Sequence, residues 1–233
     1  MPEATFKRPG HRQVHTLLSC LNATFLTETR CYFGGGTRIV VELGEYRESR
    51  DVDLLCSDRD GYRRLRETVS ETSLGAVAAS GVSLSRQIRA DQYGIRTFID
   101  IGGAKLKFEI VREARIDIEG QNVQGIPVTC LSRRHCFAEK FLANADRGMD
   151  ASTLSRDIID LAYMVNYWPQ EDAEAGLALA TTAYGDAILR SLGTVTKKLR
   201  GDKTYRKRCI NNLAVSDVKV LDKGLRQLAA ISG

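Results

Sequence analysis

A run of glycines and a pair of aspartates in the first quarter of the chain are the residues best suited to chemistry. Residues 34–36 are all glycine, Thr37 follows them, and Asp51 and Asp53 stand one residue apart shortly afterwards. A glycine turn that opens a helix presents backbone amides to an anion such as phosphate. Two carboxylates on one side of a strand can hold divalent cations that neutralise a triphosphate. This combination predicts metal-dependent transfer of a nucleotide, with Mg²⁺ or Mn²⁺ as cofactor and an NTP as substrate.

The residues around the glycines predict the elements that position this site. Residues 31–33 are apolar or aromatic and indicate a short strand, and residues 37–43 can form a helix that ends at Gly44. Residues 51–56 indicate a second strand, in which both aspartates face one side because strand side chains alternate. An Asp-x-Asp pair alone is more typical of a strand-end cap. Its position after the glycine turn favours the metal-binding interpretation.

Donors near the turn extend the predicted phosphate site. The hydroxyl of Thr37 and the guanidinium groups of Arg38 and Arg47 can donate to phosphate oxygens. The turn lacks the Lys-Ser or Lys-Thr ending of a P-loop and the spacing of a dinucleotide-binding motif, which excludes both classes. The predicted nucleotide-binding residues are Gly35, Gly36, Thr37, Arg38, Arg47 and Ser49.

A hairpin is predicted further along the chain. Residues 95–101 and 106–111 indicate two successive strands, and the Gly102-Gly103 dipeptide between them suits a tight turn. Glu109 is positioned on the second strand to offer a third metal-binding carboxylate. A glutamate that simply faces solvent on a half-exposed sheet is an equally good interpretation.

The rest of the chain is helical in pattern, so the fold class is predicted to be α+β. An amphipathic stripe indicates one helix over residues 11–29, and a charged helix is expected over 61–74. Strand signals fade after Pro127, and Ser216 is expected to cap the last helix. The predicted domains are residues 1–130, with a mixed sheet and flanking helices, and residues 131–233, a helical bundle that completes the active site and carries a basic surface.

Two polar residues interrupt the apolar stripes of the predicted helices 134–144 and 153–167. Lys140 lies between inward-facing phenylalanines, and Asp157 adjoins Ile158 on the buried face. A Lys–Asp pair that links two helices is one explanation. The functional alternative is that Lys140 holds nucleotide phosphates, while Asp157 orients Lys140, positions a metal-bound water or accepts a proton from the acceptor hydroxyl.

Charge and cysteine content limit the partners and the compartment. The net charge is +5, and seven Lys and Arg residues lie between Lys197 and Arg208, which we call the basic segment. These cations can neutralise polynucleotide phosphates, although a solvated helix surface would account for the same charges equally well. The six cysteines form no Cys-x-x-Cys pair and no run of about 18 apolar residues occurs, so we expect a reduced cytoplasmic protein without a membrane partner. The candidate RNA-binding residues are Lys197, Lys198, Arg200, Lys203, Arg206, Lys207 and Arg208.

The order of these motifs resembles the AbiEii/AbiGii-type nucleotidyltransferase toxins of bacterial toxin–antitoxin and abortive-infection systems, a group that includes the MenT toxins. The matching pieces span about half of the chain. They are Gly35-Gly36-Thr37, Arg47-x-Ser49-x-Asp51-x-Asp53, Glu139-Lys140 and Arg156-Asp157-x-x-Asp160-Leu161. The chain departs from the family where Arg38-Ile39 follows the turn, and residues 145–155 leave Asp160 as a rival to Asp157.

The resemblance implies a polymerase-β-like nucleotidyltransferase core followed by a helical domain. It implies magnesium-dependent transfer of a nucleoside monophosphate from an NTP to an acceptor, which in relatives is the 3′ end of tRNA. Asp51 and Asp53 match the metal-binding pair, and Lys140 and Asp157 match the later catalytic lysine and aspartate. Ser49 matches a serine that is phosphorylated when a cognate antitoxin silences the toxin.

Two other functions are compatible with the residues. One is a nucleotidyltransferase that acts on a small hydroxylated molecule such as an aminoglycoside, for which activity would show little salt dependence. The other is a non-catalytic, partner-binding regulator of the same fold. The presence of both Asp51 and Asp53 argues against the regulator.

Overall fold

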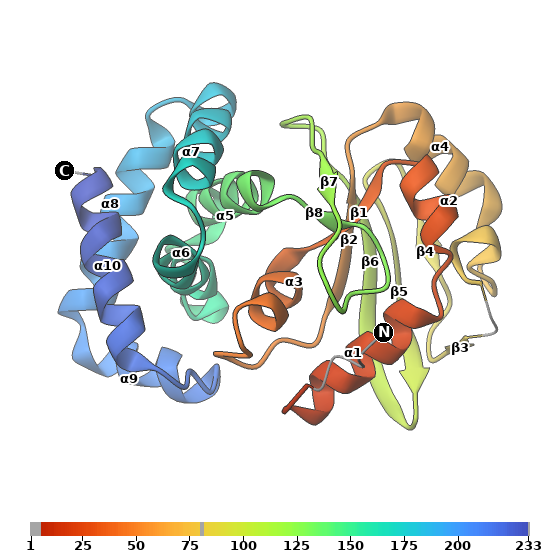
Figure 1. Ribbon diagram of the computed structural model, residues 1–233, viewed down its shortest axis with the longest axis horizontal. Coiled ribbons are helices and arrows are strands. Elements are labelled where there is room, and N and C mark those ends of the chain that lie inside the picture. The colour runs from red at the N-terminus through yellow and green to blue at the C-terminus, as the bar shows by residue number, and fades with distance from the viewer. Residues whose placement is uncertain (1–5, 80–81, 233) are drawn as a thin grey trace. The chain divides into compact units, whose positions relative to one another are not determined.

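The computed structural model describes residues 6–79 and 82–232, which form two compact units (Figure 1). Unit 1 comprises Met1–Glu42 and Ser49–Ser132, and unit 2 comprises Leu43–Glu48 and Arg133–Gly233. The short segment Leu43–Glu48 therefore belongs to the helical unit, although its neighbours in sequence on both sides belong to the first.

Unit 1 is built on a mixed sheet with the strand order β3-β5-β6-β2-β1-β8-β7, and β4 pairs with β5. The two central pairings differ in direction: β2 runs antiparallel to β1 and parallel to β6. This sheet, with its flanking helices and the helices that follow, confirms the predicted α+β fold class. The strands are β1 (Cys31–Gly34), β2 (Val52–Cys56), β3 (Ser83–Leu84), β4 (Arg89–Ala90), β5 (Gly94–Ile101), β6 (Ala104–Arg112), β7 (Gly120–Gln121) and β8 (Cys130–Leu131).

The hairpin predicted around two glycines is present. Ile101 of β5 pairs with Ala104 of β6, so Gly102 and Gly103 form a two-residue connection. Both have positive φ angles, +60° and +83°, as the tight turn that matches strand twist requires. Strand β6 is thereby aligned beside β2, where it meets Asp53.

The helices of unit 1 begin and end at different residues from those predicted. They are α1 (Pro9–Ser19), α2 (Ala23–Glu28), α3 (Gly35–Glu42) and α4 (Arg59–Thr68). The single helix expected over residues 11–29 is wrong, because Asn22 accepts a hydrogen bond from the Phe25 amide and caps a separate helix. Helix α4 also ends six residues before the predicted position, at Thr68.

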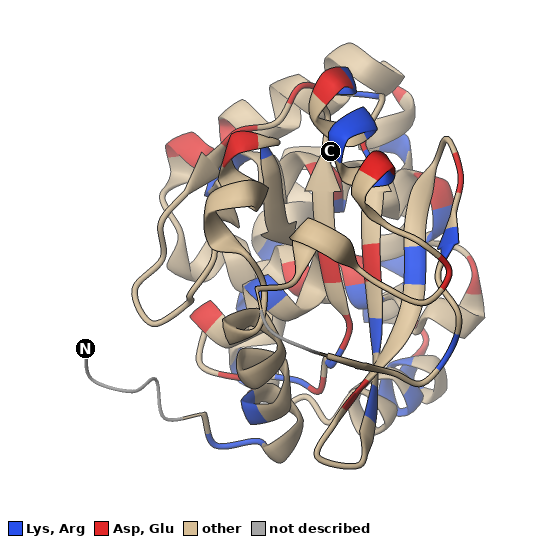
Figure 2. Ribbon diagram, turned by 90° about the vertical axis from the view of Figure 1, so that its right-hand side faces the viewer, with Lys and Arg blue, Asp and Glu red and all other residues tan. Residues whose placement is uncertain are grey.

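One face of the sheet carries the core and the other carries the carboxylates. Val52, Leu54 and Cys56 of β2 are fully buried in a cluster with residues of α1, α2 and α4. Because side chains alternate along a strand, Asp53 points to the opposite face. Figure 2, in which Asp and Glu are red, shows acidic positions on neighbouring strands of this sheet. The fold thus separates the apolar core from the polar face.

Unit 2 consists of helices that pack on one another around a core of their own. Helix α5 packs against α7 and α8, and α6 packs against α10. Ser216 was expected to cap the last helix, but Asp217 does so: its Oδ1 accepts from the amides of Lys219 and Val220. In the described part of the chain, no helix is long and apolar enough to span a bilayer. The helices are α5 (Arg133–Arg147), α6 (Arg156–Tyr167), α7 (Gln170–Tyr184), α8 (Ala187–Gly201), α9 (Lys203–Asn212) and α10 (Val218–Ser232).

Candidate active site

The backbone of Gly35 lies against the carboxylate of Asp53. Gly34 at the end of β1 pairs with Asp53 of β2, and Gly35 then opens α3 with a φ of +68°. A Cβ atom added to Gly35 would stand 2.3 Å from Oδ2 of Asp53, so no other residue fits here without moving the carboxylate. The first amides of α3 lack partners within the helix, and they therefore lie beside a carboxylate that can bind a metal ion.

Thr37 and Ser49 are joined in the same unit. Their hydroxyl oxygens lie 2.8 Å apart, which links the first turn of α3 to the segment that leads into β2. Thr37 is fully buried and Ser49 is partly exposed. The structure therefore brings together four predicted residues, namely Gly35, Thr37, Ser49 and Asp53.

Glu109 lies beside Asp53 but is engaged elsewhere. The two residues are direct partners in the parallel β2–β6 pairing. The Glu109 carboxylate forms ion pairs with Lys107 at 2.5 Å and with Arg96 at 3.4 Å. Within the described residues, no three acidic, histidine or cysteine side chains are grouped to hold a metal ion. Because two cations already neutralise Glu109, we do not retain it as a metal ligand.

Asp51 and Asp53 remain the carboxylates that fit a divalent ion. Asp51 directly precedes β2 and Asp53 is its second residue; both are partly exposed. Magnesium is commonly held by one or two carboxylates together with substrate phosphates and water, so it does not need a third protein ligand. The donor set is therefore adequate for the cofactor that the motif predicts.

Arg38 has a structural position that corrects its predicted phosphate-binding role. Its side chain is fully buried, its Nε donates to the Leu131 carbonyl at 3.1 Å, and it pairs with Glu42 one turn later. A guanidinium that connects α3 to β8 in this way has no exposed surface for a nucleotide. We do not retain Arg38 as a nucleotide ligand.

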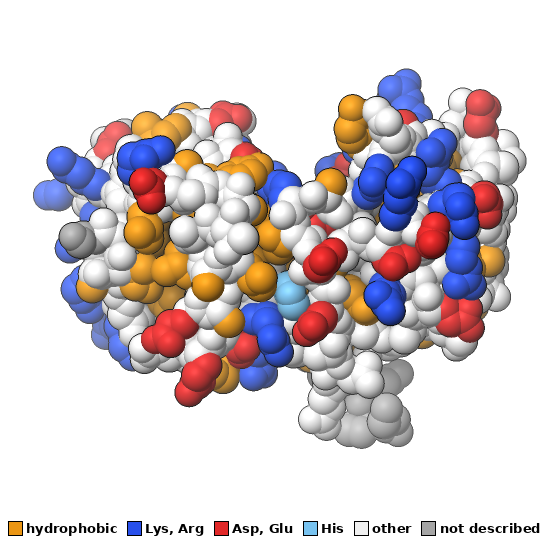
Figure 3. All heavy atoms as spheres, turned by 90° about the horizontal axis from the view of Figure 1, so that it is seen from above, with side chains coloured by type: hydrophobic (Ala, Val, Ile, Leu, Met, Phe, Trp, Pro, Cys, Tyr) orange, Lys and Arg blue, Asp and Glu red, His pale blue; other side chains and the backbone are white. Residues whose placement is uncertain are grey.

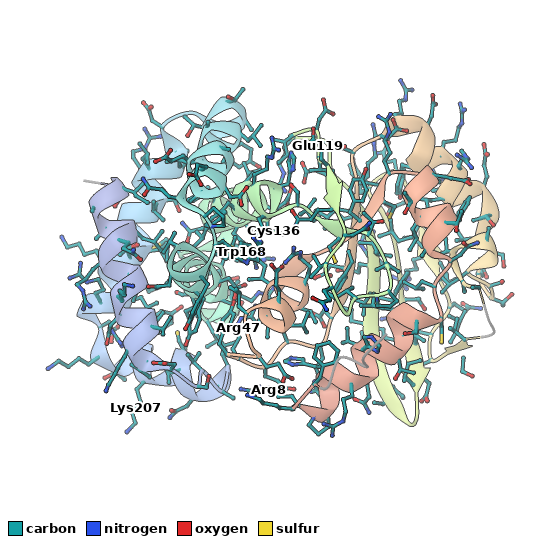
Figure 4. The ribbon with its side chains drawn as sticks, viewed as in Figure 1. Arg8, Arg47, Glu119, Cys136, Trp168 and Lys207 are labelled. Carbon is teal, nitrogen blue, oxygen red and sulfur yellow. The ribbon has the colours of Figure 1, made fainter. Side chains whose placement is uncertain are left out.

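Arg47 belongs to unit 2, where it binds Asp160 of α6. Its Nε and one terminal nitrogen donate to the two carboxylate oxygens at 2.6 and 2.8 Å, and the side chain is buried (Figure 4). The Tyr46 hydroxyl donates to the same carboxylate at 2.6 Å, and its ring stacks on Tyr163 with centroids 3.8 Å apart. A two-pronged contact of this kind is strong and directional. Asp160 therefore occupies the Arg47 guanidinium, which was predicted to bind phosphate.

Lys140 connects the same carboxylate to a second one. Its ammonium group lies 2.8 Å from Asp157 and 2.7 Å from Asp160, and all three side chains are buried. Arg147 also binds Asp157, at 2.8 and 3.0 Å. Three cations, with Arg47 included, thus surround two carboxylates, which leaves the cluster with a net positive charge. The two rival aspartates of α6 share one lysine.

Burial and charge act in opposite directions on these groups. Burial alone would raise the pKa of Asp157, but Lys140 and Arg147 outweigh it and hold the pKa well below its usual value. For Asp160, Arg47 and Lys140 likewise overcome burial and lower the pKa. Burial alone would lower the pKa of Lys140, whereas the two aspartates raise it. All three groups are therefore charged near neutral pH.

Tyr46 and Arg147 belong to this cluster but are not among the site residues that the sequence predicts. Arg147 stands seven residues after Lys140 on α5, a spacing that places both on one helix face. Asp157 and Asp160 stand three apart on α6. These spacings can be read from the sequence. The position of Tyr46 cannot, because it depends on the assignment of Leu43–Glu48 to unit 2, whose helices begin about 85 residues later.

A sequence profile of a known family matches most of this chain. The family is described as "Nucleotidyl transferase AbiEii toxin, Type IV TA system", and the match covers residues 16–214. This chain belongs to the AbiEii family. It is accordingly a nucleotidyltransferase, and the resemblance inferred from the short motifs is confirmed. The glycine turn, the aspartate pair and the Lys140 cluster all lie within the matched residues.

Solved structures similar to this AbiEii protein agree on the fold. A candidate nucleotidyltransferase from H. pylori is 16% identical, with a TM-score of 0.55 over 95% of this chain and 91% of the other. JHP933 from Helicobacter pylori is 15% identical, with a TM-score of 0.55 over 98% and 92% of the two chains. No curated protein sequence matches the chain. At these identities the structural likeness shows a shared nucleotidyltransferase fold.

The basic segment of this AbiEii protein does not form a single helix. Helix α8 ends at Gly201 and α9 begins at Lys203, because the Asp202 side chain accepts from the Tyr205 amide and caps α9. Lys198 and Arg208 lie over the Tyr205 ring, and Arg206 pairs with Asp222. The remaining cations are exposed and form no ion pair with any described residue; they are Lys197, Arg200, Lys203 and Lys207. Lys207 is labelled in Figure 4.

Proposed function

We propose that this AbiEii protein transfers a nucleoside monophosphate from an NTP to an RNA acceptor, the 3′ end of tRNA. The observation that supports this most is the contact between the Gly35 backbone and the Asp53 carboxylate. It joins a phosphate-type turn to a metal-type ligand in a chain of a nucleotidyltransferase family. A non-catalytic regulator would not require this close approach.

The proposed reaction is a displacement at the α-phosphorus. The acceptor hydroxyl oxygen forms a bond to that phosphorus, the bond to the β-phosphate oxygen breaks, and pyrophosphate leaves with the electron pair while the hydroxyl proton passes to solvent or a nearby base. The amides at the start of α3 orient the triphosphate, and the buried Thr37 hydroxyl holds Ser49 beside them. Asp51 and Asp53 would hold Mg²⁺ or Mn²⁺, which when bound neutralises the triphosphate and the departing pyrophosphate.

Lys140 and Asp157 keep their proposed roles in transfer on the motif match alone. Arg147, whose side chain is 41% exposed, gives the Lys140 cluster a net positive charge at its solvent side, which is compatible with an attraction for phosphate. The four exposed cations of α8 and α9 are proposed to contact the RNA backbone.

We further propose a cognate antitoxin that acts at Ser49. The family description names a type IV toxin–antitoxin system. Ser49 lies 2.8 Å from Thr37 in the first turn of α3. A phosphoserine carries about −1.5 to −2 charges at neutral pH and would repel a triphosphate from that helix start. Phosphorylation of Ser49 is therefore expected to silence the enzyme.

The function is tested by asking which molecule becomes labelled. The protein is incubated with Mg²⁺, total RNA and each α-labelled NTP in turn, and the products are separated by size. We expect label in tRNA-sized RNA, loss of this label in Asp53→Asn, and retention in Asp117→Asn. The second variant makes the same chemical change at an exposed aspartate of unit 1, outside the site.

Three outcomes would overturn the proposal. Label that enters only small molecules would assign a different acceptor. Equal labelling by Asp53→Asn and wild type, at equal thermal stability, would remove the aspartate from the chemistry. Absence of label with every NTP, while a folded protein is verified, would favour a regulator over an enzyme.

A further inference from the structure

Unit 1 carries an arginine-rich pocket formed by α4 and the ends of β4 and β6. Its volume is about 490 Å³. Figure 3 shows Lys and Arg side chains (blue) gathered on the surface of this unit. We call it the arginine pocket; its lining residues are Arg59, Tyr62, Arg63, Arg66, Glu67, Ala90, Gln92 and Arg112.

The helical repeat of α4 explains how three of these arginines meet. Arg59, Arg63 and Arg66 stand at positions i, i+4 and i+7, so they share one face of the helix. Arg112 is the last residue of β6 and pairs with Cys56 at the end of β2, two residues before the Asp58 cap of α4. The end of the sheet thus adds a fourth guanidinium to the helix face.

Most of this positive charge is not neutralised by the protein. Arg63 has acidic neighbours in Asp60 at 3.4 Å and Glu67 at 3.8 Å, but these pairs are well exposed to solvent and therefore weak. The other three arginines of the pocket, Arg59, Arg66 and Arg112, form no ion pair with any described residue. Four cations and one carboxylate line the pocket, so its net charge is strongly positive.

Neighbouring arginines of unit 1 show a different pattern. Arg64, on α4 but not lining the pocket, pairs with Glu28 at 3.1 Å and covers the Phe25 ring. Arg115 pairs with Glu113 at 2.7 Å. Three of the four guanidinium groups of the pocket thus lack an ion partner among the described residues, and the pocket brings them together on one surface. Guanidinium forks match phosphate geometry, so phosphate is the ligand chemistry that this arrangement suits.

The distance from the carboxylates favours a polymer over the NTP itself. Arg112 lies three residues beyond Glu109 on β6, which is roughly 10 Å along the strand. By alternation it also points to the opposite face of the sheet from Asp53. A triphosphate held at the start of α3 would not extend this far around the sheet, whereas the backbone of a longer acceptor can.

We propose that the arginine pocket binds backbone phosphates of the RNA acceptor, at a distance from its reacting end. The choice of RNA as the polyanion rests on the proposed function; the phosphate chemistry rests on the pocket alone. The pocket supplies non-sequence-specific affinity, because contacts to phosphate carry no base information. It also gives unit 1 an RNA contact that is independent of the basic segment of α8 and α9.

The test compares two triple variants that lose the same charge. The pocket variant is Arg59→Gln/Arg66→Gln/Arg112→Gln, and the control is Arg64→Gln/Arg86→Gln/Lys105→Gln, which neutralises exposed cations of unit 1 elsewhere. Binding of a labelled tRNA is measured from about 50 to about 200 mM salt. We expect the slope of log affinity against log salt to fall by about 2 in the pocket variant, since each phosphate contact contributes about 0.7 to 0.9, and to change little in the control.

Nucleotide binding and a second variant separate the alternatives. Arg59→Gln/Arg66→Gln, which alters only exposed positions of α4, should lower the slope by about 1.5 and guards against misfolding of the triple variant. Binding of Mg·ATP should be unchanged in both. Equal salt slopes for the pocket and control variants would overturn the proposal, as would a loss of ATP binding with RNA binding intact, which would make the pocket a nucleotide site.

The same measurements distinguish failure of the pocket proposal from failure of the proposed function. If wild type labels RNA and the pocket variant binds and labels RNA as wild type does, the pocket proposal fails while the function stands. If wild type binds RNA through the pocket but labels nothing, the pocket proposal stands while the function fails. If the protein binds anionic lipid vesicles tightly and does not bind RNA, the arginine pocket is a membrane-binding site and the RNA-binding proposal is overturned.

Discussion

Replacing Gly35 by alanine is the sharpest test of the candidate active site. The new Cβ would stand 2.3 Å from Oδ2 and 2.9 Å from Cβ of Asp53. An alanine held at a φ of +68° also adopts a left-handed conformation that L-residues disfavour by roughly 1 to 2 kcal/mol. The change therefore perturbs both the backbone and the carboxylate that the site depends on.

The magnitude follows from these two terms. Asp53 must leave its rotamer to move Oδ2 away, which costs about 0.5 to 1.5 kcal/mol. The backbone must also shift slightly, because the 2.9 Å contact with Cβ of Asp53 does not depend on the rotamer. Together with the backbone term, the expected loss in the free energy of unfolding is about 2 to 3 kcal/mol. For a chain of this size that corresponds to a fall in Tm of about 4 to 12 °C. A displaced carboxylate should also lower the rate of transfer by about 100-fold.

Gly102→Ala is the matched control for this prediction. Gly102 has nearly the same φ, +60°, but an added Cβ would meet nothing within 4 Å. It therefore carries the backbone cost without the clash. Thermal unfolding and single-turnover transfer are measured for both variants and wild type. If Gly35→Ala is no less stable than Gly102→Ala and transfers at the wild-type rate, the inferred contact between turn and carboxylate is not what the site requires.

Three further predictions concern the charged cluster and Ser49. Lys140→Met should lower the free energy of unfolding in urea by about 3 to 5 kcal/mol, because it leaves two buried carboxylates short of a partner; unchanged transfer per folded molecule would limit the lysine to a structural role. The pKa values of Asp157 and Asp160 are lowered on folding, so their stabilisation is complete above about pH 4 and is lost as the pH falls through the folded-state values. The acid limb of Tm against pH should be shallower in Asp157→Asn, and an identical limb would contradict the assignment. Ser49→Asp should raise KM for the NTP while Ser49→Ala does not, and equal KM values would exclude charge at the start of α3 as the cause.

Local rules made much of unit 1 predictable. The Gly102-Gly103 turn, the strand before the glycine run and the alternation along β2 each depend on neighbours a few residues away. The break between α1 and α2 was also local, since Asn22 is a favoured capping residue within an otherwise apolar stripe. The pairing of Glu109 with Lys107 could have been anticipated, because the two residues share a strand face.

Tertiary contacts decided what could not be predicted. Arg38 finds its carbonyl acceptor at Leu131, 93 residues away in sequence. Arg47 finds Asp160, 113 residues away. In the sequence, Arg38 and Arg47 simply stand near a glycine turn. A guanidinium at such a position can bind a phosphate, a buried carboxylate or a backbone carbonyl equally well. Only the folded chain distinguishes these partners.

The assignment of Leu43–Glu48 to unit 2 has a practical consequence for dissecting this protein. The polypeptide passes from one unit to the other three times, so cleavage after Ser132 does not yield two self-sufficient pieces. An isolated carboxy-terminal fragment would retain Asp160 and Lys140 but lose the Arg47 guanidinium and the Tyr46 phenol that bind the same carboxylate. Expression of the helical half would require a linker that re-supplies this six-residue peptide, or its addition in trans.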